Sequence, residues 1–176
     1  MPDKIKEYLS CPIFMCGAIF SISVFSLGTA LIAEHVYNLD PCILCIYQRI
    51  PFAIAALLSL LGLILSYSPD RMKMVAGLIF LSALCFLAGS IIAAYHTGVE
   101  RHWWASFLEG CTVDFGDSND LLAMIENTQA ARCDEIPWAD PIIGLSMANY
   151  NAVMSLGLFV FCMVSAIFTA RRANGF

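Results

Sequence analysis

The chain has 176 residues, of which 60% are hydrophobic and 13% are charged, and its mean hydropathy is strongly positive. This composition lies outside the usual range of soluble globular domains and predicts a membrane protein. The net charge of −5 argues against a nucleic acid as a partner.

Four apolar stretches are long enough to cross a hydrocarbon core of roughly 30 Å at about 1.5 Å per helical residue. They cover residues 13–36, 46–67, 74–95 and 145–170. The first stretch is longer than the apolar part of a signal peptide, so we interpret it as a true span. We therefore expect an all-α, polytopic membrane protein in which residues 1–176 form one domain, a four-helix transmembrane bundle.

Most of the basic residues lie outside the segments 38–44 and 96–144. Six of the nine lie at the chain ends and between the second and third spans (Lys4, Lys6, Arg71, Lys73, Arg171 and Arg172). The positive-inside rule therefore predicts both termini in the cytoplasm of a bacterial inner membrane. The segments 38–44 and 96–144 then form periplasmic loops, and the second loop carries nine acidic residues.

Each outer loop contains two cysteines, Cys42 and Cys45 in the first and Cys111 and Cys133 in the second. An oxidising compartment favours disulfides, so two structural bridges are one interpretation. The C-x-x-C pair, however, closes a very small ring, and such rings stabilise little and are more often redox-active. The other four cysteines lie in or beside the spans and are expected to pack as small apolar residues (Cys11, Cys16, Cys85 and Cys162).

A four-cysteine zinc site is a further alternative for the outer loops. Such sites usually have roughly two to four residues between the partners of each pair. Because 21 residues separate Cys111 from Cys133, we expect no metal.

The start of the second span combines the thiol pair with a charge. Cys45 is expected in the first helical turn, where the helix dipole stabilises a thiolate. Arg49 follows one turn deeper on the same face, where a cation lowers a thiol pKa and can hydrogen-bond a ligand. Pro51 predicts a kink or a late helix start. An arginine inside a span indicates a functional site, and the alternative is an arginine that snorkels to the headgroups.

A thiol pair at the membrane surface needs an electron acceptor, and a lipid-soluble quinone fits this need. The second cysteine pair could exchange disulfides with a soluble partner. His35 and His96 stand at the outer ends of helices, where either could hydrogen-bond a quinone carbonyl or protonate a quinol. The alternative for both is polar packing at the interface.

Tyr95 and the aromatic residues after it predict an interfacial aromatic belt. A short helix is expected within 117–131.

The motifs together resemble the DsbB family of disulfide bond formation proteins. The resemblance rests on "PCILCIYQR" after "EHVYNLD", on "YH" at the end of the third span, on the second cysteine pair and on "CDEIPW" before "GLSMANYNAVMSL". It covers nearly the whole chain. It implies a thiol:quinone oxidoreductase that reoxidises a DsbA-like periplasmic thioredoxin-fold protein. Its electrons would pass to the membrane quinone pool and the respiratory chain, in support of protein folding.

The resemblance also implies a role for each cysteine. DsbA would attack a Cys111–Cys133 disulfide at Cys111, and Cys133 would then attack Cys42. Cys45 would be released as a thiolate and form a charge-transfer adduct with ubiquinone or menaquinone, supported by Arg49. Two rival interpretations are a scaffold with two structural disulfides and a quinone reductase similar to vitamin K epoxide reductase.

Overall fold

The computed structural model describes residues 9–108, 111 and 132–174, and the helix expected within 117–131 lies outside them. This part of the chain contains four long helices: α2 (Pro12–His35), α3 (Ile43–Leu65), α4 (Met72–Glu100) and α6 (Met147–Ala173). A short 3-10 helix, η1 (Pro69–Arg71), precedes α4. Each long helix is apolar and long enough to cross a membrane. The predicted all-α four-helix bundle is therefore confirmed.

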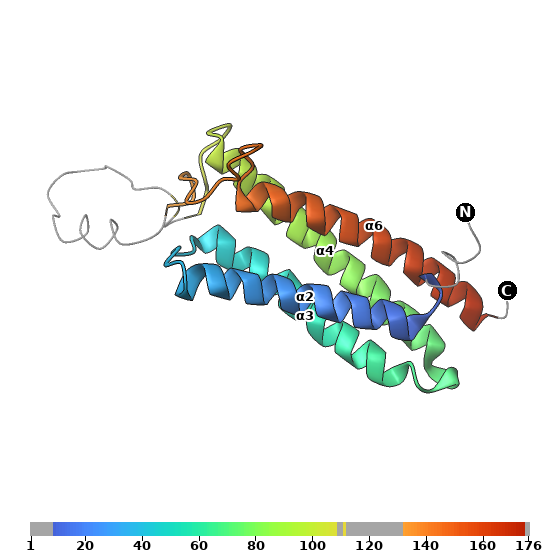
Figure 1. Cartoon of the computed structure of the whole chain (residues 1–176). Helices are drawn as coiled ribbons and strands as arrows, with labels where there is room; N and C mark the ends of the chain where they lie inside the picture. The colour runs from blue at the N-terminus through green and yellow to red at the C-terminus, as the bar shows by residue number, and fades with distance from the viewer. Residues whose placement is uncertain (1–8, 109–110, 112–131, 175–176) are drawn as a thin grey trace, which may run out of the picture.

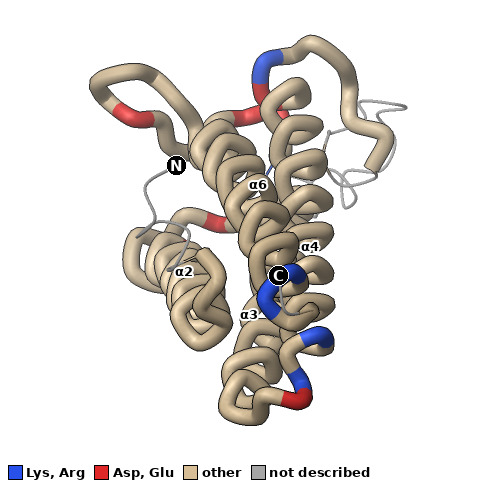
Figure 2. Tube along the Cα trace, turned by 90° about the vertical axis from the view of Figure 1, so that its right-hand side faces the viewer, with Lys and Arg blue, Asp and Glu red and all other residues tan. Residues whose placement is uncertain are grey.

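The four helices run back and forth along one axis (Figure 1). The start of α2 and the end of α6 lie at the same end of the bundle, where Ser165 Oγ donates a hydrogen bond to the carbonyl of Leu9. Basic residues mark this end, where α6 finishes and where α3 connects to α4 (Figure 2). The C-x-x-C pair and the second outer loop lie at the opposite end, which we call the outer end. The cytoplasmic location of the termini remains a prediction.

Two of the differences between the observed and predicted helix boundaries affect the site. α3 begins at Ile43 rather than at 46, because Cys42 caps the helix and its Sγ accepts the backbone N–H of Cys45. Of the kink or late start predicted from Pro51, the late start does not occur, since α3 runs from Ile43 through that proline to Leu65, and the kink stays a prediction. α4 continues to Glu100, so residues 96–100 are helical and not part of a loop. The hydropathy pattern ended at residue 95 because polar residues follow, yet His96 and Glu100 are buried.

α4 is the central helix of the bundle. It packs along both α3 and α6, and α2 packs on α3, whereas α2 makes few contacts with α6. The core between the helices contains Phe86, whose ring contacts that of Phe52 edge to face. Large apolar side chains cover the outside of the helices, as a lipid environment requires; examples are Phe25, Leu57, Ile64, Ile91 and Val153.

Aromatic side chains gather at the outer end of α4. Tyr95 stacks on Trp104 and lies beside Phe107, while Trp103 contacts Trp104 edge to face. The indole of Trp104 also donates to the carbonyl of Tyr95. Trp103 and Phe107 are 68% and 79% exposed, so this cluster presents its aromatic surface outward. Its position in an interfacial belt remains a prediction.

Candidate active site

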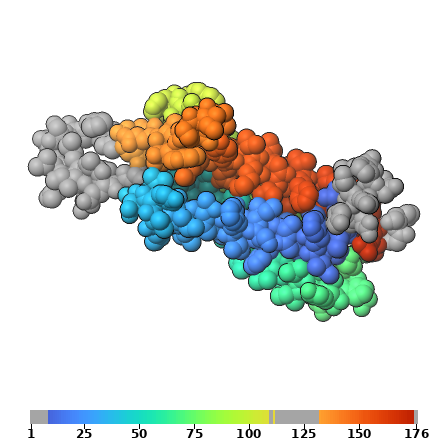
Figure 3. Space-filling model, in the orientation of Figure 1, coloured from blue at the N-terminus to red at the C-terminus, as the bar shows by residue number. Residues whose placement is uncertain are grey.

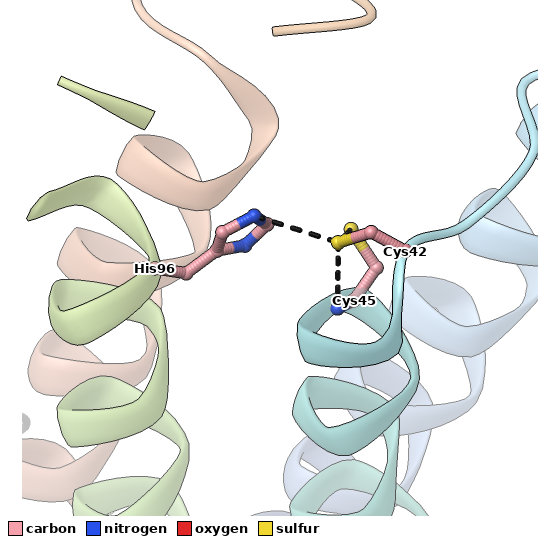
Figure 4. A group of neighbouring side chains, drawn as sticks. All are labelled: Cys42, Cys45 and His96. Atoms are coloured by element: carbon pink, nitrogen blue, oxygen red, sulfur yellow. Dashed lines mark hydrogen bonds between the residues drawn. The ribbon is translucent and has the colours of Figure 1, made fainter. Parts of the chain in front are cut away.

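The C-x-x-C pair lies at the first turn of α3 (Figure 4). Cys42 is the N-cap and Cys45 is the third residue of the helix, so the first helical turn brings the two thiols together. Both are free cysteines, and their sulfur atoms are 3.2 Å apart in a hydrogen bond. Cys42 is buried, whereas Cys45 is only partly buried. The pair therefore has one sulfur packed against protein and one closer to open space.

His96 approaches the pair from α4 (Figure 4). Its Nε2 lies 3.5 Å from the Sγ of Cys42. The hydrogen bond from Cys45 is the largest influence on Cys42, and together with His96 it outweighs burial and lowers the pKa of Cys42 to about 4. In the reduced pair the negative charge therefore lies on Cys42, although the sequence predicted it on Cys45. The main reason is the hydrogen bond from the thiol of Cys45, and the backbone N–H of Cys45, which bonds to the N-cap residue Cys42, adds a smaller contribution.

A chain of amides holds His96 in place. Nδ1 of His96 lies 2.8 Å from the side-chain nitrogen of Gln48. The carbonyl of Gln48 accepts a hydrogen bond from Asn151 of α6, whose own carbonyl accepts from Ser155. Each of these buried polar groups thus has a partner inside an apolar bundle, which rigidifies the ring that faces Cys42.

Glu100 is one helical turn beyond His96 and is also buried. One of its carboxylate oxygens accepts a hydrogen bond from Ser146, the N-cap of α6, and the other lies 3.8 Å from Nε2 of His96. The sequence analysis counted Glu100 only as one of the acidic residues of a loop. The i, i+4 spacing of His96 and Glu100 was the available signal, but it has meaning only if α4 continues past residue 95.

The second cysteine pair lies beside the first. Cys111 and Cys133 form a disulfide and are both fully buried. They pack in one cluster with Cys42, Leu44 and Val99. The structure therefore brings together the four cysteines that the sequence singled out, although they come from two loops that are far apart in the chain.

Arg49 is paired with an acidic residue of the neighbouring helix. Its guanidinium donates to the carboxylate of Glu34 on α2, and the two side chains are 23% and 28% exposed. No motif in the sequence singles out Glu34 as the partner of Arg49. His35, the next residue, is exposed, and its ring bonds to the carbonyl of Leu31 in its own helix. Arg49 is thus part of the site, whereas the structure does not bring His35 to it.

A cavity of about 1130 Å³ opens between α2 and α6 and reaches the thiol pair. The hollow is visible between these two helices in Figure 3. Cys42, Cys45, Arg49, His96 and Glu100 line its outer part. Its remaining wall is largely apolar and includes Phe25, Leu27, Ala30, Ala33, Phe52 and Met154. The weak contact between α2 and α6 explains why the cavity has room for a ligand and a side opening.

The two thiols and the imidazole form one compact cluster. The Sγ atoms of Cys42 and Cys45 and a ring nitrogen of His96 all lie within 4.8 Å of one another. The imidazole is therefore close to both sulfur atoms of the pair.

The fold and the site define a four-helix, multi-pass membrane protein with two adjoining cysteine pairs at one end of the bundle. The family described as disulfide bond formation protein DsbB matches residues 13–165. The chain belongs to this DsbB family.

Several relatives share most of their length with the chain. A disulfide bond formation protein B from Aromatoleum aromaticum is 30% identical over 89% of this chain and 92% of its own. One from Herminiimonas arsenicoxydans is 28% identical over 89% and 91%. An uncharacterized protein from Rickettsia prowazekii is 24% identical over 81% of both chains. No solved structure gives a significant match.

Proposed function

We propose that the chain is an inner-membrane thiol:quinone oxidoreductase that reoxidises a DsbA-like periplasmic protein and delivers the electrons to a membrane quinone. The observation that carries the proposal is the position of the Cys42–Cys45 pair. It packs against the Cys111–Cys133 disulfide on one side and lines a largely apolar cavity on the other. A thiol pair in this position can receive electrons from a soluble partner and release them to a lipid-soluble acceptor.

The first half of the reaction is disulfide exchange. A thiolate of the DsbA-like partner attacks Cys111, and its second thiol completes the partner's disulfide while Cys111 and Cys133 become reduced. Cys133 then attacks Cys42 of an oxidised Cys42–Cys45 pair and releases Cys45 as a thiolate. Cys111 in turn attacks Cys133, which restores the Cys111–Cys133 disulfide and releases Cys42. Each step is thiolate attack on a disulfide, and together the steps move two electrons inward. The shared cluster of Cys42, Cys111 and Cys133 supports this order, because the attacking and attacked residues already pack together.

The second half delivers the electrons to the acceptor. A quinone supplies the site with a carrier that takes two electrons and two protons and leaves as a quinol. The cavity fits such a molecule, because its wall is largely apolar and its outer end presents the guanidinium of Arg49 beside the thiols. Glu34 holds that guanidinium across the α2–α3 contact. Ubiquinone and menaquinone share this chemistry, and either would serve.

The orientation in the membrane is part of the proposal. Both termini are in the cytoplasm, and the outer end with its four cysteines faces the periplasm. The basic residues at the opposite end support this orientation through the positive-inside rule.

The proposal is tested by the visible absorption spectrum of purified protein with added quinone after mild reduction. Wild type is expected to give a long-wavelength band that is absent in Cys45→Ser and weakened in Arg49→Ala. Arg101→Ala is the matched control, since Arg101 is an exposed arginine at the outer end whose side chain donates to the carbonyl of Gly144. It should leave the band unchanged.

Turnover with a reduced DsbA-like protein gives the second readout. We expect wild type to form quinol, and Cys111→Ser to lose activity with this partner. The absence of both the band and quinol formation, with two disulfides inert to the reduced partner, would instead support a membrane scaffold with structural disulfides.

A further inference from the structure

Glu100 is a buried carboxyl group that the proposed electron path does not use. It stands in the last turn of α4, at the outer end of an apolar bundle, and only 6% of its surface is exposed. Burying a carboxyl group in such surroundings is costly, and acidic residues in membrane helices commonly take part in proton transfer. A purely structural role for Glu100 would have to explain all of the contacts that its carboxyl group makes.

The surroundings of Glu100 leave half of its carboxyl group directed to the site. One oxygen accepts the hydroxyl of Ser146, which accounts for the anchoring of the side chain. The other oxygen faces Nε2 of His96 at 3.8 Å, and Glu100 lines the same cavity as Cys42 and Cys45. A carboxyl group needed only to cap α6 would not have to reach this cavity.

The charged and titratable groups around Glu100 come from three parts of the chain. His96 faces it from the same helix, and the thiols of Cys42 and Cys45 face it from the start of α3. Arg101 is its neighbour in sequence and is exposed. Ser146 is its partner from α6 and does not titrate in the ordinary range. A proton on Glu100 is therefore adjacent to the redox groups, and the exposed Arg101 marks the nearby edge to water.

The proton balance of the site shows what such a group could supply. Joining the two sulfurs releases two electrons, and a quinone needs these together with two protons to become a quinol. A pair consisting of a Cys42 thiolate and a Cys45 thiol contains only one proton. The second proton must come from another group in or near the cavity.

We propose that Glu100 is the proton donor that completes quinol formation in this site. The inference rests on the proposed function. The Cys42 thiolate, the Cys45 thiol, the Glu100 carboxylic acid and the quinone yield the Cys42–Cys45 disulfide, the Glu100 carboxylate and the quinol. Two electrons and two protons reach the quinone, and the charge on both sides is −1. The carboxylate regains its proton from water at the outer end when the thiol pair is next reduced.

The test is the variant Glu100→Gln, which can keep the hydrogen bond with Ser146 but cannot give up a proton. Protein is reduced with a small dithiol, and quinol formation is followed over a series of pH values. We expect a rate at least about tenfold below wild type at neutral pH, since positioned acid catalysis typically contributes about 10²–10⁴-fold. The loss should deepen as pH rises, because the second proton then comes from solvent.

Two variants and one spectrum separate a proton donor from a structural residue. Glu100→Asp retains an acid and should recover part of the rate. Asp70→Asn removes an exposed carboxylate of η1, which is not part of the cavity lining, and should match wild type. In the infrared difference spectrum between oxidised and dithiol-reduced protein, a carboxylic acid C=O band should appear in wild type and vanish in Glu100→Gln.

The outcomes distinguish this inference from the proposed function. If wild type forms no quinol from the reduced pair, the proposed function itself is wrong. If wild type forms quinol while Glu100→Gln has the same rate and pH profile and keeps the infrared band, only the role of Glu100 is refuted. A uniform loss in Glu100→Gln that Glu100→Asp does not relieve, without any change in the infrared band, would also refute it and would assign Glu100 to structure.

Discussion

The reduced Cys42 thiol should show an unusual pH dependence of its reaction with an alkylating reagent. With a pKa of about 4 against an ordinary value of about 9, Cys42 is a thiolate throughout the range from pH 5 to 8. Its alkylation rate should therefore stay flat over that range. An ordinary thiol in the same range gains about tenfold in rate for each pH unit, because its thiolate population does.

The pH dependence of the alkylation rate tests the pKa of Cys42 better than the absolute rate does. At pH 6, Cys42 has roughly a thousandfold more thiolate than an ordinary thiol. Its intrinsic nucleophilicity is lower by roughly two hundredfold, since nucleophilicity falls with pKa with a coefficient of about 0.4–0.5. The net advantage is only about fivefold, and burial of Cys42 can cancel it by slowing access of the reagent. Burial does not change the slope of the alkylation rate against pH, however.

The assay is alkylation of dithiol-reduced protein, with each cysteine resolved by peptide mass spectrometry so that the other free cysteines serve as internal references. Cys45→Ala removes the main hydrogen-bond donor and should restore a rising profile, whereas Cys45→Ser keeps a donor and should stay nearly flat. His96→Ala should have a smaller effect than Cys45→Ala. A wild-type rate at Cys42 that rises tenfold per unit between pH 5 and 8 would refute the reasoning.

Two further predictions concern the surroundings of the pair. Glu34→Gln should raise the KM for quinone by about two- to fivefold, because a part-exposed ion pair that orients Arg49 contributes about 0.5–1 kcal/mol. An unchanged KM in steady-state quinol assays would contradict this. Asn151→Leu leaves the buried carbonyl of Gln48 without its partner and should lower the free energy of unfolding in detergent by about 1–3 kcal/mol, as measured by denaturant titration. Equal stability would show that Gln48 finds another donor.

Hydropathy and motif spacing predict the helices and the thiol pair because both are local properties of the sequence. The four spans follow from apolar length alone, and the position of Cys45 in the first turn of α3 follows from where the apolar run starts. The same method ended α4 at 95, because a hydropathy pattern cannot distinguish a polar residue in a loop from a buried one that has a partner. His96 has its partner in Gln48 of α3, and Glu100 has its partner in Ser146, the N-cap of α6; both partners lie far away in the sequence.

The positions of Glu34 and His35 show a second limit of prediction from the sequence. Consecutive residues of a helix point about 100° apart, so only one of the two can face α3. The sequence supplied a chemical reason to prefer the histidine as a quinone ligand. The packing of α2 on α3 instead directs Glu34 to Arg49 and leaves His35 on the outside. The rotation of one helix against another depends on side-chain packing along its whole length, which a short motif does not contain.

Because Cys42 caps α3, the proposed disulfide exchange changes which cysteine has the negative charge. While Cys42 is a free thiolate, it accepts the hydrogen bonds of Cys45 and lies beside His96. When the Cys133 thiolate instead attacks Cys42 of the oxidised pair, the Cys42 sulfur is neutral in the Cys42–Cys133 disulfide, and Cys45 leaves as the thiolate. Cys45 is one turn from Arg49 on the same helix, and both line the cavity. The mixed disulfide therefore has its negative charge on the arginine side of the site, where a quinone has access, whereas the fully reduced pair has it on the histidine side. An Arg49→Ala variant should accordingly slow electron release from the mixed disulfide more than alkylation of the fully reduced Cys42, and equal effects on both would argue against this division of roles.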